Sequence, residues 1–162
     1  MTLIEAARAD IGKKEKPGNT GFVDPKLEAE MKAVGWAPGW AWCACIQWKW
    51  VWQAYPEKKD AVKGLFVPSA VNTFRNLVKA GFKHSMIPEV GALVYWQKME
   101  NGKELWTGHA GIVSRVVSDT EFYSIEGNTN SKGSREGDSV QEKHRFVKPV
   151  KNGLKVIGFV TL

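Results

Sequence analysis

The feature that most constrains the fold is a change of pattern near the middle of the chain. Up to about residue 81 the apolar residues recur at helical spacing, and beyond it they gather in short runs of β-branched and aromatic residues. Helices followed by strands, with only short turn-rich segments between the strands, are typical of α+β proteins. We therefore predict N-terminal helices packed on a C-terminal antiparallel sheet.

Four helices are predicted in the first half. The first spans about residues 2–11, where Thr2 and Glu5 have the spacing of a capping box and Gly12 ends the helix. The others cover about residues 25–34, 42–55 and 69–80, bounded by glycine or proline. In the third helix the predicted buried stripe consists of Ala44, Trp48, Val51, Trp52 and Tyr55. The face with Cys43, Gln47 and Trp50 lies off this stripe, so we expect it to point toward whatever packs against the start of the helix or toward a cleft.

Five runs in the second half predict strands, at residues 91–98, 108–117, 122–128, 139–148 and 155–162. The segments between them are rich in turn residues, as in 100–104, 117–120 and 128–138. A chain of 162 residues has the length of one domain, so we predict a single domain over residues 1–162.

Composition and charge exclude several classes of protein. With 43% hydrophobic and 25% charged residues the chain is not disordered, and it has no apolar run long enough to cross a membrane. The N-terminus lacks the features of a secretory signal peptide, so we expect synthesis in the cytoplasm and another route of release. The net charge of +6 suits an anionic partner, but the basic residues are scattered, and we do not expect nucleic-acid binding. We expect the chain to act as a monomer.

Cys43 is the first candidate for chemistry. It lies at the predicted start of the third helix, where free backbone N–H groups and the helix dipole favour a thiolate. Cys45 lies on the far side of the same helix, so the two thiols should not form a disulfide, and we expect it to be a core residue. The spacing of the cysteines and histidines does not match a zinc site.

A cysteine nucleophile needs a base and a group that orients the base. His109, between two glycines at the start of a strand, is the best candidate, whereas His84 in a turn and His144 among charges are expected to have ordinary roles. Glu126 and Asn128 follow on the next predicted strand and share one face.

The order of these two residues relative to His109 depends on strand register. A two-residue turn at 119–120 would place Gly111 opposite Asn128, which brings Asn128 nearer to His109 than Glu126. A bulge at Gly127 would change this order. Either side chain could accept the imidazole Nδ1–H.

Three motifs together resemble the CHAP family, the cysteine, histidine-dependent amidohydrolases and peptidases. They are Trp42-Cys43-Ala44, the run Gly108-His109-Ala110-Gly111-Ile112-Val113, and Glu126-Gly127-Asn128. The resemblance spans nearly the whole chain. It implies a papain-like fold of the NlpC/P60 type and hydrolysis of an amide bond in peptidoglycan. Many members are phage endolysins or bacterial wall hydrolases.

The resemblance also implies roles. Cys43 would attack the amide carbonyl, and His109 would keep the thiolate activated and protonate the leaving amine. Glu126 would hold the imidazole, and Asn128 would share that task or polarise the substrate. The backbone N–H of Cys43 is the expected oxyanion donor.

The substrate cleft is expected to have aromatic walls. Trp40 and Trp42 flank the nucleophile in sequence and are the predicted substrate-binding residues. Trp96 and Trp106 either wall the cleft from the sheet side or belong to the core. We expect no cofactor and no metal, because residues 37–42, just before the nucleophile, contain no carboxylate of the kind with which some family members bind calcium there.

Several functional alternatives stay open. The motifs suit a muramoyl–L-alanine amidase and a peptide endopeptidase equally. A phage or prophage endolysin and a secreted antibacterial amidase effector differ only in delivery. A cysteine protease acting on proteins and a non-catalytic wall-binding module are the further alternatives.

Overall fold

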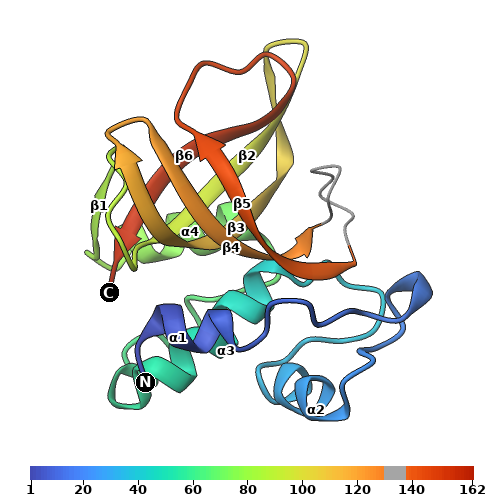
Figure 1. Cartoon of the computed structure of the whole chain (residues 1–162). Coiled ribbons are helices and arrows are strands. Elements are labelled where there is room, and N and C mark those ends of the chain that lie inside the picture. The colour runs from blue at the N-terminus through green and yellow to red at the C-terminus, as the bar shows by residue number, and fades with distance from the viewer. Residues whose placement is uncertain (130–137) are drawn as a thin grey trace.

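The computed structural model describes residues 1–129 and 138–162, and these form the predicted α+β architecture. The helices lie on one side of a single antiparallel sheet, with α1, α2 and α3 below the sheet in Figure 1 and α4 behind it. Because helices fill the first half of the chain and strands the second, the layers follow the sequence order.

The helices begin close to where their capping residues predict. Their bounds are α1 Leu3–Arg8, α2 Pro25–Ala33, α3 Cys43–Ala54 and α4 Ala70–Lys79, with short 3₁₀ turns at Pro17–Asn19 and Pro56–Lys58. Thr2 and Glu5 form the predicted capping box, and Asp24 and Ser69 cap α2 and α4. In the described part of the chain, none of these helices has the length and apolar character needed to cross a membrane.

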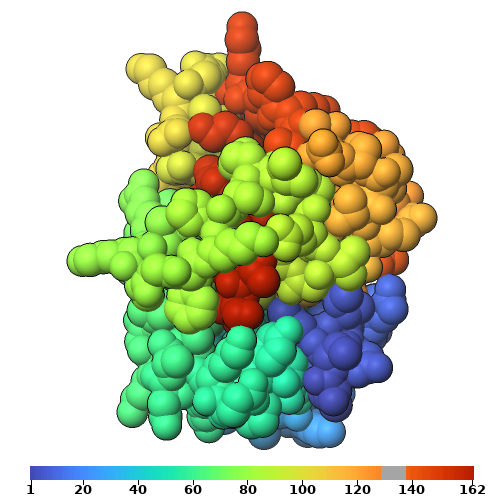
Figure 2. Space-filling view, turned by 90° about the vertical axis from the view of Figure 1, so that its left-hand side faces the viewer, coloured from blue at the N-terminus to red at the C-terminus, as the bar shows by residue number. Residues whose placement is uncertain are grey.

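The described residues form six strands, one more than predicted. They are β1 Lys83–Ser85, β2 Leu93–Glu100, β3 Lys103–Ser118, β4 Glu121–Thr129, β5 Ser139–Phe146 and β6 Gly153–Thr161, in the order β1-β6-β2-β3-β4-β5. β1, which contains His84, was expected to be a turn. Three residues are too few to show a strand pattern, and β1 exists because it pairs with β6. In Figure 2 the red C-terminal residues lie against the yellow-green segment that contains β1.

One predicted turn falls largely outside this description. Residues 130–137 of the turn-rich segment 128–138 lie outside the described residues.

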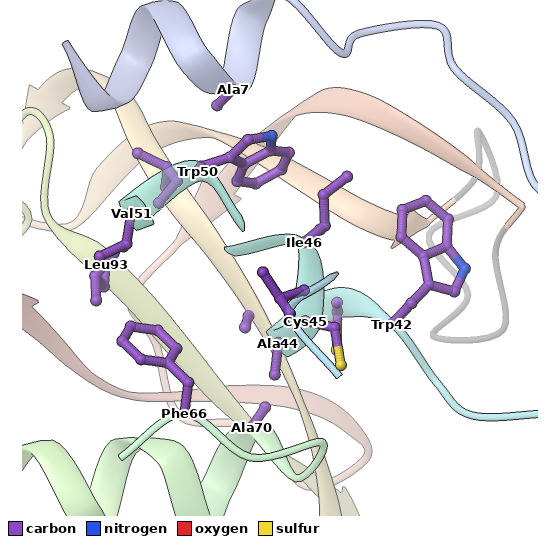
Figure 3. Packing of buried hydrophobic residues seen from close by; sticks show 14 of the residues in the cluster. Ala7, Trp42, Ala44, Cys45, Ile46, Trp50, Val51, Phe66, Ala70 and Leu93 are labelled. Carbon is purple, nitrogen blue, oxygen red and sulfur yellow. The ribbon is translucent and has the colours of Figure 1, made fainter. Parts of the chain in front are cut away.

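The predicted buried stripe of α3 does not describe the burial of the whole helix. Gln47 and Trp50, which lie off the predicted stripe, are fully buried, whereas Trp48 and Trp52 on it are only partly buried. The reason is that α3 packs against α1 on one side and against β3 and β4 on the other. Figure 3 shows core side chains on several sides of the helix, with Trp50 toward α1.

The predicted two-residue turn between β3 and β4 is confirmed, because Ser118 pairs with Glu121. The register beyond it is wrong. Two irregularities, one between Val113 and Arg115 and one between Val116 and Ser118, each place an extra residue in β3. The pairing therefore shifts by two residues, and Ile112 lies opposite Ile125. This shift moves Glu126 toward the position that the simple hairpin gave to Asn128.

A buried ionic cluster joins α2 and α3 to the segment that follows α1. The carboxylate of Asp10 accepts hydrogen bonds from Lys49 and from the Trp50 indole at 2.8 Å, and it pairs with Lys13 at 2.8 Å. Lys49 also pairs with Glu30 at 3.0 Å. Burial would raise the pKa of Asp10, but the hydrogen bonds from Lys13 and Lys49 outweigh it and lower the pKa.

Asp10→Asn is expected to lower the free energy of unfolding by about 3–5 kcal/mol, because it leaves the buried Lys49 ammonium poorly compensated. Urea denaturation at neutral pH measures this change. The matched control is Glu104→Gln, which breaks an exposed pair with Lys155 of 2.8 Å and should cost no more than about 1 kcal/mol. Equal, small losses in both variants would show that the cluster does not hold the helices together.

Candidate active site

Cys43 is the first residue of α3 and lines a small pocket. Its exposed fraction is only 3%, and no side chain caps the helix start. The pocket has a volume of about 80 Å³ and is lined by Ala41, Cys43, Pro68, Ser69, Ala70, Trp106, Thr107 and Gly108. Because the N–H groups of a helix's first turn have no partners within the helix, an anion at this position would meet free backbone donors.

His109 and Glu126 form a buried pair across β3 and β4. The Nε2 atom of His109 lies 2.8 Å from Oε2 of Glu126, and both side chains are almost completely inaccessible to solvent. The prediction that the carboxylate would bind Nδ1 is therefore wrong. Nδ1 has no hydrogen-bond partner among the described residues, which leaves this atom free to face the nucleophile.

The carboxylate of Glu126 is held by two further side chains that the motifs did not indicate. Arg145, on β5, donates from Nε to Oε1 at 2.8 Å and from Nη2 to Oε2 at 2.6 Å. Ser124 donates to Oε1 at 2.6 Å. Burial alone would raise the pKa of Glu126, but Arg145 and then His109 outweigh it and lower the pKa to about 2. The carboxylate is consequently ionised at every pH near neutrality.

The same contacts control the charge of His109. Burial alone would lower its pKa, but the interactions with Cys43 and Glu126 outweigh burial and raise the pKa to about 9. The thiol is therefore close enough to the imidazole to influence its charge. A protonated imidazole beside a thiol is the arrangement that favours a thiolate–imidazolium pair.

Two glycines of the His109 motif are needed for close contacts. A Cβ atom on Gly111 would lie 2.9 Å from Cγ of Glu126, and one on Gly108 would lie 2.2 Å from the carbonyl oxygen of Trp96. Glycine at 111 therefore leaves the path by which the Glu126 side chain reaches His109. Glycine at 108 lets β3 lie tightly on β2.

Gln47 fixes the nucleophile's helix to the histidine's strand. It lies one turn after Cys43, and its amide Nε2 donates to the carbonyl oxygen of Gly111 at 2.8 Å. A fully buried glutamine with this bond keeps Cys43 and His109 in register. The sequence signal that could have identified Gln47 is its position four residues after Cys43.

Asn128 is buried, and its amide nitrogen has no hydrogen-bond partner among the described residues. It has φ of 55°, at the point where the pairing of β4 with β5 is irregular. A buried amide donor without a partner is costly. The amide nitrogen of Asn128 is thus not committed to the imidazole of His109.

Of the two tryptophans expected to contact substrate, only Trp40 is accessible. Trp42 is fully buried and packs edge-on against Phe22 at a centroid distance of 5.0 Å. A Cβ on Gly127 would lie 2.6 Å from the Trp42 ring, so this indole rests directly on β4. Trp42 therefore positions the start of α3 and has no surface to offer a substrate.

A second, larger groove adjoins the pocket at Cys43. Its volume is about 680 Å³, and its lining consists of Trp40, Ala41, Val67, Pro68, Ser69, Asn72, Asn76 and Trp106. Trp106 is 83% exposed, whereas Trp96 is buried with its ring centroid 5.5 Å from that of His109. Trp106 is therefore a cleft residue and Trp96 a core residue.

The remaining candidate residues, Cys45 and His144, have contacts that are typical of structural residues. Cys45 is buried, burial raises its pKa to about 12, and both cysteines are free. His144 lies on the surface, where it pairs with Glu121 at 2.7 Å and stacks on Tyr123. Within residues 1–129 and 138–162 there is no cluster of three or more His, Cys, Asp or Glu side chains arranged to hold a metal ion.

One comparison with known proteins finds a family match. The family model described as CHAP domain matches residues 34–128, more than half of the chain, and this range includes Cys43, His109, Glu126 and Asn128. Arg145 lies beyond it. No curated protein matches the chain.

Glu126→Gln is expected to lower the pKa of His109 from about 9 by roughly 1–3 units, because the buried anion beside Nε2 is lost. Asn128→Ala should leave it within a few tenths of a unit. NMR titration of the imidazole signals measures both. Glu121→Gln is the matched control, since it removes a carboxylate from His144 instead. A large shift in Asn128→Ala with none in Glu126→Gln would overturn the assignment.

Proposed function

The chain belongs to the CHAP domain family, and we propose that it hydrolyses an amide bond of peptidoglycan with Cys43, His109 and Glu126 as its catalytic group. Members of this family are in general cysteine- and histidine-dependent amidohydrolases or peptidases that act on peptidoglycan. The observation that carries the proposal for this chain is the buried 2.8 Å contact of His109 with Glu126, formed beside a cysteine at a helix start.

The proposed reaction has two steps. The Cys43 thiolate attacks the amide carbonyl carbon, and the oxyanion is stabilised by the backbone N–H of Cys43. As the C–N bond breaks, the imidazolium of His109 gives its proton to the leaving nitrogen, and a thioester remains on Cys43. A water molecule, deprotonated by the now neutral His109, attacks the thioester carbon. The C–S bond breaks, which releases a carboxylic acid and restores the thiolate–imidazolium pair.

Glu126 and Asn128 are assigned different tasks. Glu126, ionised through its contacts with Arg145, orients Nε2 of His109 and stabilises the imidazolium. Asn128 polarises the substrate carbonyl, a role supported by its buried amide nitrogen without a partner among the described residues. All the reacting groups are side chains, so the proposed chemistry requires no metal or cofactor.

The size of the pocket favours a wall peptide over a general protein substrate. At about 80 Å³ it accepts small groups next to the scissile bond, and Ala41, Ala70 and Gly108 line it. Peptidoglycan offers such bonds, because lactyl, alanyl and glycyl groups flank its amides. A non-catalytic wall-binding module would have no use for an ionised, fully buried Glu126 beside His109.

The net charge of +6 supports a role on an anionic surface such as the cell wall. We propose that the protein acts there after release, as a phage or prophage endolysin. An antibacterial effector is the second possibility, and a neighbouring immunity gene would distinguish it from an endolysin.

Cys43→Ala is expected to reduce lysis of purified walls by more than about 1,000-fold, because it removes the nucleophile. Cys45→Ala should retain most of the activity, since the Cys45 thiol is buried and its pKa of about 12 keeps it protonated. Turbidity of a wall suspension measures the rate, and circular dichroism confirms that both variants fold. Lysis by Cys43→Ala at the wild-type rate would refute the mechanism.

Arg145→Met is expected to move the acidic limb of the pH–activity profile upward by about 1–3 units. The sign follows from Glu126: its pKa, held at about 2, rises when the guanidinium is removed, so the carboxylate is protonated at a higher pH. Arg145→Lys should restore part of the shift. Arg115→Met, on an exposed arginine that stacks over Tyr123, is the control and should leave the profile unchanged. Identical profiles in Arg145→Met and the wild type would exclude this role.

A further inference from the structure

The large groove continues from the catalytic pocket. Ala41, Pro68, Ser69 and Trp106 line both, so whatever occupies the groove reaches the sulfur of Cys43 through the small pocket. The volume of about 680 Å³ lies within the usual range for sites that bind small molecules. The groove therefore holds the part of the substrate that lies next to the scissile bond.

Two accessible indoles from different layers form part of the groove wall. Trp40 belongs to the loop before α3 and is 44% exposed, and Trp106 belongs to β3 and is 83% exposed. The loop is held by a hydrogen bond of 3.2 Å from the Trp36 indole to the carbonyl oxygen of Trp40. Accessible aromatic faces in a fixed cleft suit a ligand with flat apolar faces, such as a pyranose ring.

The polar groups of the groove carry no charge. Ser69, Asn72 and Asn76 are the polar residues in its lining. The side chain of Asn76 donates to the Leu65 carbonyl at 3.0 Å, which fixes the orientation of its amide. Neutral hydroxyl and amide groups match the hydroxyl and acetamido groups of an amino sugar. The stem peptide of peptidoglycan instead brings carboxylates, and a carboxylate placed in this groove would lose water without gaining a cation.

We infer that the groove binds the glycan strand, with an N-acetylmuramoyl residue next to Cys43, and that the bond cut is the amide between the lactyl carbonyl and L-alanine. This inference rests on the proposed function and selects the amidase over the endopeptidase. The small lactyl group matches the pocket of about 80 Å³. The sulfur of Cys43 bonds to the lactyl carbonyl carbon, the C–N bond breaks, and the alanine nitrogen takes the proton from His109. Water then releases the muramic carboxylate.

The first test measures binding separately from catalysis. NMR titrations use protein with Cys43→Ala alone, or combined with Trp40→Ala, Trp106→Ala or Phe146→Ala. The probes are the disaccharide of N-acetylglucosamine and N-acetylmuramic acid, with its lactyl carboxyl group capped as a methylamide so that it carries no charge, and the free stem tetrapeptide. The disaccharide should bind more tightly than the peptide, and each tryptophan variant should weaken its binding roughly tenfold. Phe146→Ala is the matched control, because this aromatic residue is 46% exposed and lies outside the groove lining.

Tighter binding of the peptide, or disaccharide binding that neither tryptophan substitution alters, would overturn the inference.

The second test is mass spectrometry of the fragments that the wild-type protein releases from purified walls. Stem peptides with a free N-terminal L-alanine are the expected product. New termini within the stem or the cross-link would support the proposed function but refute the amidase assignment. Absence of any amide cleavage would refute the proposed function, and the disaccharide titration would still decide what the groove binds.

Discussion

The buried carboxylate of Glu126 joins side chains from three neighbouring strands. It accepts hydrogen bonds from Ser124 on its own strand β4 and from Arg145 on β5, and it contacts His109 on β3. A buried carboxylate without such partners would take up a proton, and His109 would then lose the anion that holds it charged. Because the arginine pairs with both carboxylate oxygens, the carboxylate stays ionised and the imidazole keeps a pKa of about 9. The position and the charge of the catalytic base therefore have one common origin.

This electrostatic arrangement is possible only where the backbone leaves room for it. Gly111 provides the space through which the Glu126 side chain passes, and its carbonyl oxygen accepts the hydrogen bond from Gln47. The two irregularities of β3 supply the register that brings Ile112 opposite Ile125, so that the next residues along each strand, Gly111 and Glu126, meet. If β3 lacked these two bulges, Asn128 instead of Glu126 would lie opposite Gly111, whatever the sequence of the motif.

The sequence was sufficient to predict the four α-helices and five of the six described strands, and to single out Cys43, His109 and Glu126 as candidates, because each carries a local signal. Capping residues mark the helix starts, and Cys43, His109 and Glu126 each stand in a recognisable motif. The register was mispredicted because the bulges involve ordinary residues, Ser114 and Val117, that have no signature. Arg145 was missed because it shares the half-buried face of β5 with two other polar residues, Gln141 and Lys143. Nothing in the sequence distinguishes Arg145 from these two neighbours. Such contacts depend on which strand lies beside β4, and that is a tertiary property.

The segment that matches the family model is not by itself a complete site. It ends at residue 128, whereas the arginine that ionises Glu126 lies on β5. β5 is an edge strand, and its first residues are held from the far end of the chain: Gly12 donates to the carbonyl oxygen of Val140, and Val140 donates to that of Lys13. The residues before the match thus bind the strand that follows it, and that strand places Arg145 on the carboxylate. The N-terminal segment consequently supports the charge of His109 although it contributes no atom to the reaction.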